Sequence, residues 1–454
     1  MVEETIFSDQ ITHTNNKDTT AVRETKSPVE ASLGVSEKWD ARDAGREVAE
    51  TAIQNLTRPP DFFLLFSTIH YEKYGGFQEF LNGVWDVLPK GTPLIGCTVP
   101  GFLNNYGCYT IGATALAVSY PNADVVLGVG KNTKRDPKNA ANQSAEMIKK
   151  GLANSQYKNK FLLNIVSGPE TWKIPGEGYK KIVDSGFWSK FATLAFGISQ
   201  YLLQKGSGRE DEIFEYLVQK FPEYYMILGA SMDDYRGISN YQFFNNKVLT
   251  NSLVNLGFAT DLDINVCTTH GMKRTNIKFE ITKLSKDKHI IKEINQKPAV
   301  PELLHILDWP EGFLNEKTMY NIIPYYPISF KRHNREVPTI MPGFLKNSIV
   351  TPSVIDVGEV SILTISGRDM INSIKEGLQN FEYIDPEFGL FSTCITILTT
   401  LGSKINLIQK EIIGHFKQKP FIMFFSAGEG TYSPERNLTY ANISFNTAIL
   451  GHSK

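Results

Sequence analysis

The chain has 454 residues, of which 41% are hydrophobic and 21% are charged, and its formal net charge is −1 at pH 7. This length and composition allow a sizeable buried core in two large domains or about three average ones. The small net charge gives no overall field that would attract nucleic acid or an anionic membrane, and no apolar run approaches the length of a transmembrane helix. The four cysteines have no CxxC spacing, which argues against a disulfide scaffold and against a zinc site.

The N-terminal segment, residues 1–36, is polar and without periodicity, so we predict a disordered tail. It has neither the basic nor the apolar region of a signal peptide, and the cytoplasm is therefore the expected compartment. Structure is predicted to begin with an Ala-rich helix over residues 39–56. Asp40 is placed to cap this helix, and Pro59 and Pro60 end it.

Continuous apolar runs indicate buried strands in the first half of the chain. The runs at 61–68 and 93–99 flank a predicted helix at 76–89, so we expect the two strands to pair in parallel. A helical region is expected at about 187–220, and the segment 240–258 reads as a hairpin with Asn245 and Asn246 at its turn. The further predicted strands are 113–120, 124–130, 161–168 and 224–231.

The pattern changes near residue 260, where the long apolar runs are lost, and we place a domain boundary there. A charged β-like segment at 275–300 and an irregular Pro-rich segment at 322–354 follow, and strands and helices then alternate. The predicted fold class is α/β, a mixture of α and β elements. The sequence predicts two modules, residues 37–260 and 261–454, built on largely buried mixed sheets flanked by helices.

Common catalytic motifs are absent from the sequence. There is no P-loop, HExxH or GxSxG motif, and the GxG at 128–130 lacks the third glycine of a dinucleotide site. The eight histidines are scattered without ligand spacing. No metal and no cofactor are therefore expected.

Three strand ends carry small or acidic residues that suit a ligand site. A turn role is the alternative for each, because acids in turns cap backbone N–H groups and glycines adopt positive φ. The cysteine in the first turn could be a nucleophile, a pocket wall or strand-end packing, and no local sequence supplies it with a base. The candidates are Gly96, Cys97 and Thr98; Ser231, Asp233 and Asp234; and Ser426, Gly428 and Glu429.

Taken in order, these elements resemble the FIST family (F-box and intracellular signal transduction) of intracellular sensory proteins. The resemblance covers about residues 38–450, and its specificity lies in the order and spacing of the motifs rather than in any one of them. In the first half it rests on DARDAGREVAETAIQNL, PDFFLLFST, LPKGTPLIGCTVPG and YYMILGASMDDYRG. In the second half it rests on INQKPAVPELLHIL, YYPISF, GEVSILTISGRDMINSIKEGL, KPFIMFFSAGEG and LTYANISFNTAIL.

The resemblance implies a small-molecule-binding input module for signal transduction, with amino acids as the suggested ligand class. Relatives are often fused to output domains; none is recognisable here, so a separate output partner is implied, with neither nucleic-acid binding nor membrane insertion. The family often places an arginine shortly after a Ser-Cys pair, whereas no arginine follows Cys394. The ligand is therefore expected to differ, or to be absent.

The leading hypothesis is that the three turns converge on one ligand cleft. One alternative is an enzyme of unrecognised type that uses Cys97 or Cys394 as its nucleophile. The other is a partner-binding scaffold whose pocket has degenerated.

Overall fold

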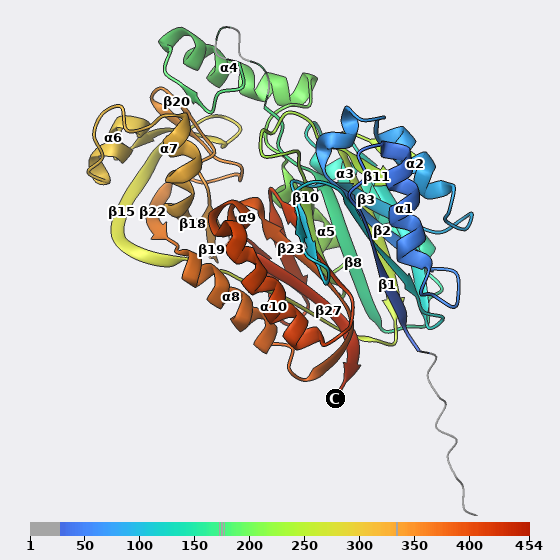
Figure 1. Cartoon of the computed structure of the whole chain (residues 1–454). Coiled ribbons are helices and arrows are strands. Elements are labelled where there is room, and N and C mark those ends of the chain that lie inside the picture. The colour runs from blue at the N-terminus through green and yellow to red at the C-terminus, as the bar shows by residue number, and fades with distance from the viewer. Residues whose placement is uncertain (1–27, 172, 174–175, 177, 333–334) are drawn as a thin grey trace, which may run out of the picture.

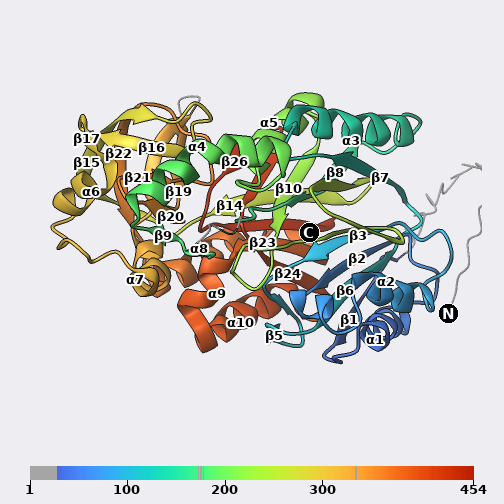
Figure 2. The same cartoon turned by 90° about the horizontal axis from the view of Figure 1, so that it is seen from above.

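The structure is a computed structural model that describes residues 28–171, 173, 176, 178–332 and 335–454. These residues form four β-sheets covered by helices, which confirms the predicted mixed α/β class (Figures 1 and 2). No helix within the described ranges is long and apolar enough to cross a membrane.

The first sheet contains the two apolar runs predicted as parallel strands. They form β2 and β3, which pair in parallel with Leu65 opposite Gly96, and the prediction is confirmed. Asn245 and Asn246 form the turn between β11 and β12, so the predicted hairpin is also confirmed. In spatial order the strands are β1 (Glu30–Ser36), β6 (Ala113–Ser119), β2 (Phe62–Ser67), β3 (Leu94–Thr98), β11 (Gln242–Phe244) and β12 (Lys247–Leu249).

Helices α1 (Ala41–Ile53) and α2 (Phe77–Trp85) cover one face of this sheet. The Asp40 carboxylate accepts a hydrogen bond from the backbone N–H of Asp43 at 3.0 Å, which confirms the predicted cap. The helices approach each other closely because Gly45 faces the backbone of α2, where a Cβ would lie 2.0 Å from the carbonyl oxygen of Phe80.

The predicted disordered tail extends too far along the chain. Residues 1–27 lie outside the described residues, but residues 30–36 form strand β1, which pairs antiparallel with β6. Leu33 enters the core, while the next residue, Gly34, lets α1 approach so closely that a Cβ would meet the carbonyl of Val48. A seven-residue strand with only one large buried side chain is too weak a pattern to stand out in a polar segment.

The second sheet carries helices α3 (Pro137–Gly151) and α5 (Glu210–Lys220) on its outer face. Strands β8 and β10 pair in parallel, and their carboxyl ends place Ser167 opposite Ser231. The strands in spatial order are β26 (Asn437–Tyr440), β25 (Glu429–Ser433), β10 (Tyr225–Ser231), β8 (Asn159–Ser167), β13 (Ser252–Thr260) and β7 (Ala123–Lys131).

The third sheet packs against helices α8 (Gly367–Gln379), α9 (Ile395–Leu401) and α10 (Ile405–Phe416). Strands β23 and β24 are parallel, and Cys394 lies opposite Ser426 at their carboxyl ends. The strands in spatial order are β14 (Asp263–Thr269), β27 (Phe445–Ser453), β23 (Ile384–Cys394), β24 (Phe421–Ser426), β4 (Phe102–Asn104) and β5 (Cys108–Tyr109).

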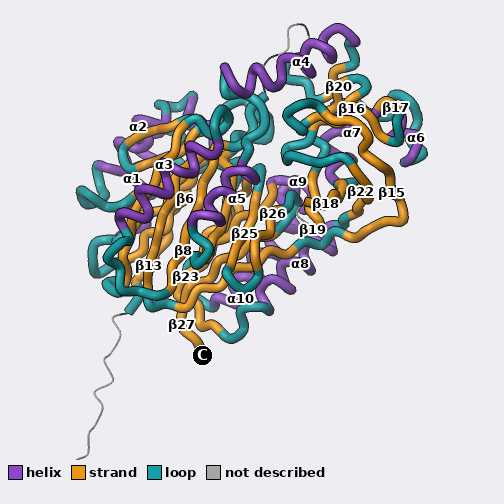
Figure 3. The backbone as a smooth tube through the Cα atoms, turned by 180° about the vertical axis from the view of Figure 1, so that it is seen from behind, coloured by secondary structure: helices purple, strands orange, loops and turns teal. Residues whose placement is uncertain are grey.

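The fourth sheet forms the other end of the molecule, together with α6 (Ala299–Ile306), α7 (Glu316–Asn321) and α4 (Gly186–Leu202). Seen from behind, α4 runs along the upper edge of the fold and is separated from α3 and α5 (Figure 3). The strands are β19 (Arg335–Thr339), β18 (Ile328–Arg332), β22 (Gly358–Thr364), β15 (Lys273–Leu284), β16 (Ile290–Ile294), β21 (Ser348–Val350), β20 (Gly343–Leu345) and β9 (Ile182–Val183), with β17 (Lys297–Pro298) paired to β16.

The first three sheets share one aromatic core. The rings of Phe66 in β2 and Phe424 in β24 stack with their centroids 4.5 Å apart. Phe62 meets the edges of Phe258 and Phe388, from the second and third sheets, at 5.5 and 6.1 Å. Strands with such neighbours on both faces need apolar side chains at consecutive positions, which explains the uninterrupted apolar runs.

The sheets do not respect the boundary predicted near residue 260. The chain passes there from β13 in the second sheet to β14 in the third. However, β4 and β5 join the third sheet, β9 joins the fourth, and β25 and β26 join the second. The modules predicted at 37–260 and 261–454 therefore exchange strands.

Candidate functional site

The three strand ends predicted to converge lie side by side. The backbone N–H of Met232 donates to the carbonyl of Thr98 at 3.0 Å, which joins the first turn to the second. The N–H of Ala230 donates to the carbonyl of Gly428, also at 3.0 Å, which joins the second turn to the third. This edge brings together the ends of β3, β10 and β24.

Cys97 belongs to the apolar core at this edge. Its side chain is fully buried among the residues that the first three sheets share. Burial raises the pKa of the thiol well above its usual range, so the sulfur is protonated at neutral pH. Its neighbours have backbone roles: a Cβ at Gly96 would lie 1.7 Å from the carbonyl of Leu65, and Thr98 Oγ1 accepts the N–H of Tyr241 at 3.0 Å.

The two adjacent acids of the second turn differ in their surroundings. The buried Asp233 carboxylate accepts the backbone N–H groups of Gly237 and Ile238, both at 2.7 Å, and burial raises its pKa. Asp234 is exposed and pairs with the Arg236 side chain at 2.7 Å. Asp233 therefore holds its own turn together, as acids in turns commonly do.

A buried acidic pair lies at the third turn, where Glu429 is close to Glu210 from the start of α5. Ser426 Oγ donates to Glu429 Oε1 at 2.8 Å, and Tyr440 donates to Glu210 Oε1 at 3.1 Å. Gly428 lies against Glu210, since a Cβ there would be 2.4 Å from Oε1. The Oε2 atoms of both glutamates have no hydrogen-bond partner among the described residues. Burial raises the pKa of Glu210 to about 8 and that of Glu429 well above its usual range.

A cavity of about 220 Å³ opens beside these turns, between α4, α7, α9 and strand β20. None of the nine candidate side chains is among the described residues that line it, although Met232 and Ala427 line it from the same turns. In an extended chain successive side chains point to opposite sides. Met232 and Ala427 therefore face the cavity, whereas the preceding residues, Ser231 and Ser426, point into the protein.

The wall of the cavity is mostly apolar. Methionines and aromatic rings from both halves of the chain contribute, as does the thiol of Cys394, whose pKa burial raises to about 12. That thiol is therefore protonated at neutral pH, which argues against a nucleophilic role. The larger apolar side chains are Phe196, Met232, Tyr235, Met319, Tyr320, Ile323 and Met341.

Within the described part of the chain, three charged side chains also line the cavity, the acid Glu170 and the amines Lys180 and Lys181. Lys181 donates to Thr171 Oγ1 at 3.2 Å and to the carbonyl of Arg236 at 3.1 Å, and burial lowers its pKa. Glu170 is buried, pairs with Lys205 and accepts the side-chain amide of Asn240 at 2.9 Å. The cavity therefore offers both signs of charge.

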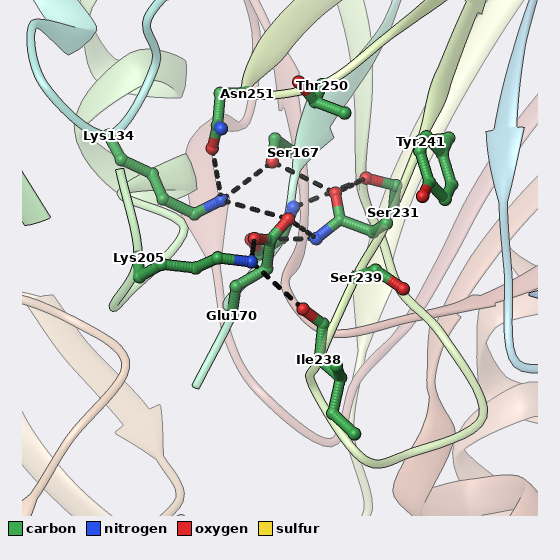
Figure 4. A network of polar contacts seen from close by, with 12 residues as sticks. Lys134, Ser167, Glu170, Lys205, Ser231, Ile238, Ser239, Tyr241, Thr250 and Asn251 are labelled. Carbon is green, nitrogen blue, oxygen red and sulfur yellow. Dashed lines mark hydrogen bonds and ion pairs between the residues drawn. The ribbon is translucent and has the colours of Figure 1, made fainter. Parts of the chain in front are cut away.

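Behind Glu170 lies a buried polar network that the sequence did not reveal (Figure 4). Lys134 Nζ donates to Ser167 Oγ at 2.9 Å and to Asn251 Oδ1 at 2.7 Å, and lies 3.7 Å from Glu170 Oε1. Burial lowers the pKa of Lys134 to about 8. Ser167 and Ser231 both donate to Asn240, at 3.0 and 2.7 Å. The network therefore fixes the carboxyl ends of β8 and β10.

The sequence held little signal for this network. Lys134, Glu170, Lys205 and Asn251 lie on four separate loops. The antiparallel pairing of β13 with β7 and β8 brings the loops of Lys134, Asn251 and Glu170 together, and a bridge between Glu170 and Gly206 adds the loop of Lys205. No spacing rule joins such positions. Among the residues that the structure describes, no three His, Cys, Asp or Glu side chains lie together as metal ligands would.

A comparison with models of protein families shows the family to which the chain belongs. The model described as FIST N domain matches residues 61–297, more than half of the chain. The chain belongs to the FIST family. The FIST domain is a sensory domain of signal transduction. The matched range crosses residue 260, in agreement with the strand exchange between the predicted modules.

Other comparisons add little to the FIST assignment. No curated protein sequence matches the chain. A crystal structure of cyanuric acid hydrolase from A. caulinodans is similar with a TM-score of 0.37 and 6% identity, covering 94% of this chain and 100% of that one. T. maritima PurL complexed with AMPPCP has a TM-score of 0.18 and 10% identity, covering 93% and 72%. Neither likeness is close enough to support an inference.

The departure from the FIST pattern after Cys394 falls on the cavity wall. Ile395 and Thr396, at the start of α9, line the cavity beside Cys394. The segment where FIST sequences often have arginine therefore offers no cation here. An anionic ligand group would have to use Lys181 or Lys180 instead.

Proposed function

We propose that this FIST protein binds a small zwitterionic ligand with an apolar side chain, an amino acid of the larger apolar kind, in the cavity beside the three turns. The observation that carries the proposal is the combination of an apolar wall with an acid, Glu170, and the neighbouring amines Lys180 and Lys181. Ligand sites in proteins commonly combine an apolar lining with a few oriented polar groups.

The hydrogen-bonding capacity of both groups supports this proposal. The Lys181 ammonium has three donors, and within the described residues it uses two of them, for Thr171 and the Arg236 carbonyl, which leaves one for a ligand carboxylate. A carboxylate offers about four acceptor positions, and within the same residues Glu170 uses three for Lys205, Asn240 and the more distant Lys134. One position therefore suits a ligand ammonium.

Signalling from such a site requires that occupancy changes the protein. The cavity wall takes Glu170 and Met232 from the first half of the chain, and Met319 and Met341 from the second. A ligand in the cavity would therefore contact both halves of the chain at once, and its binding could change how the two halves are held together. We propose that a separate cytoplasmic partner reads this change.

A thermal-shift screen of the standard amino acids tests the proposal. Ligands with larger apolar side chains should raise the melting temperature, because a ligand at about 100 times its Kd stabilises the folded state by about 2.7 kcal/mol. Glu170→Gln and Lys181→Met should each abolish the shift. The control variant is Glu387→Gln. Glu387 lies on β23 and forms an ion pair with Lys419, and its replacement should leave the thermal shift unchanged. Shifts that survive both cavity variants would show that the ligand binds elsewhere.

A further inference from the structure

Helix α4 exposes a second apolar face in addition to the one that it packs inward. Trp188 and Phe196 are partly buried against a small core cluster, whereas the fully buried side chains of the helix are small or polar. A surface helix normally has one apolar stripe, which it buries. The buried side chains are Ser189, Ala192, Ser199 and Gln200. The large apolar side chains that α4 and the next residue expose are Phe187, Phe191, Ile198, Tyr201, Leu202 and Leu203.

The exposed residues form a band along the helix rather than scattered points. Phe187 is 70% exposed near the start of α4, and Leu202 is 60% exposed at its end. Ile198 and Leu202 are four residues apart and so lie on the same side. The 17-residue helix is roughly 25 Å long. An apolar band of this length on a protein surface marks an interaction site.

The position of α4 leaves this face accessible. The helix lies at the top of the fold, above the fourth sheet, with the other helices below it (Figure 1). The view from behind places it along the same outer edge (Figure 3). A helix at the outer edge of a molecule can contact an extended surface.

Basic side chains outnumber acidic ones among the described residues around α4. The acids nearby are Asp184, two residues before the helix, and Asp287, whose carboxylate lies beside Gly197. No Asp or Glu occurs between residues 186 and 203, and the exposed Lys190 is on the helix. Arg135 donates to the carbonyls of Tyr201 and Leu202 at the end of the helix, at 2.8 and 3.3 Å, and the exposed Lys346 lies beside its first residue, Gly186. A second copy of this face would bring like charges together, whereas an anionic surface complements them.

We propose that α4 docks on an anionic lipid surface, with its apolar band among the acyl chains and its basic residues among the headgroups. Helices that lie in a membrane interface combine a bulky apolar face with flanking Lys and Arg. The whole chain has a net charge of −1, so the attraction is local to α4. The proposal does not depend on the cavity ligand.

Vesicle co-sedimentation of the full chain tests the proposal. Vesicles of phosphatidylcholine with 30% phosphatidylserine should bind the protein more tightly than phosphatidylcholine alone, and 0.5 M NaCl should weaken that binding. The double variant Phe187→Ser/Leu202→Ser should lose roughly tenfold or more in lipid affinity, because two large apolar side chains no longer enter the bilayer. Lys190→Glu should weaken binding several-fold to the anionic vesicles only.

Leu407→Ser is the matched control, since Leu407 is 44% exposed on α10 and distant in sequence from α4. It should bind vesicles as the native protein does. All of these side chains are exposed, so the melting temperature of each variant should match that of the native protein. Absence of native binding to anionic vesicles, or equal binding by the double variant, would overturn the proposal. Self-association that the double variant abolishes, without lipid binding, would assign the face to a second copy instead.

Discussion

Two buried polar clusters lie at the same end of the second sheet and differ in how they accommodate burial. Around Lys134, an ammonium and the Glu170 carboxylate compensate each other, and side-chain oxygens accept the remaining protons. Around Glu210 and Glu429, two carboxyls lie together. Within the described residues neither forms an ion pair and each has one oxygen without a hydrogen-bond partner, although Lys134 is close enough to attract Glu210 electrostatically.

The difference shows two ways in which a protein tolerates buried ionisable groups. A buried charge is tolerable when it is paired and hydrogen-bonded, and a buried acid without a cation is tolerable when it is protonated. The raised pKa of both glutamates indicates the second case, while the lysine network is the first. The following predictions test this contrast, from the largest expected effect to the smallest.

Removing the central cation should have the largest effect. Lys134→Met leaves Glu170, Ser167 and Asn251 without a donor that they now share, so we expect a loss of about 3 kcal/mol in the free energy of unfolding. Lys205→Met should cost less, because that side chain is 34% exposed and water can replace it. Urea unfolding at pH 7 measures both. Equal losses of unfolding free energy in the two variants would mean that the burial of a lysine does not determine how much it stabilises the protein.

The adjacent acids Asp233 and Asp234 provide an intermediate case, because Asp233 is buried but saturated with backbone donors. Asp233→Ala should cost about 1–3 kcal/mol, since it leaves the N–H groups of Gly237 and Ile238 without their acceptor. Asp234→Ala removes only an exposed ion pair with Arg236 and should change stability by less than about 1 kcal/mol. Urea unfolding of both variants decides the matter, and a reversed order would contradict the assigned roles.

The acidic cluster should show itself in the pH dependence of stability. The pKa of Glu210 is about 8 in the folded protein and about 4.3 in the unfolded chain, so the folded state keeps a proton that the unfolded state loses. The stabilisation is complete below about pH 4.3 and is lost as the pH rises to about 8. Glu210→Gln should therefore be nearly neutral at pH 4.5 and increasingly stabilising relative to the native protein towards pH 8. Urea unfolding across this range tests the sign, and an opposite trend would refute a neutral Glu210.

Thiol reactivity gives the smallest and most local test. Cys394 is near Glu429 and lines the cavity, whereas Cys97 is sealed in the core. Both pKa values are raised by burial, so neither thiol should react with iodoacetamide within minutes at pH 6. On long incubation Cys394 should react before Cys97, as peptide mass spectrometry would show. Rapid alkylation of either at pH 6 would revive the nucleophile hypothesis.

Much of the local structure could be predicted from the sequence. The helix cap at Asp40, the parallel pair β2 and β3, and the hairpin turn at Asn245 follow from short-range patterns that tertiary contacts did not override. The meeting of the three turns was also predicted, and they lie side by side although β3, β10 and β24 belong to three different sheets. The ligand-binding role of the nine residues there stays a prediction.

The identity of the cavity wall could not be predicted in the same way. Met232 and Ala427 face the cavity, and the candidates beside them do not, because a shift of one residue reverses the side to which an extended chain points. The sequence showed where the strands end but not which side of each strand end is open.

By itself, the sequence determined which segments are buried strands and their order along the chain, because apolar runs, caps and turn residues act over a few positions. The order and spacing of these segments also indicated the family. The tertiary structure decided which strands cross between the modules and which loops supply Lys134, Glu170 and Lys205. It also decided that α4 exposes a band of large apolar side chains. These properties depend on contacts between residues far apart in the chain, and no local pattern encodes the neighbours that a side chain meets only after folding.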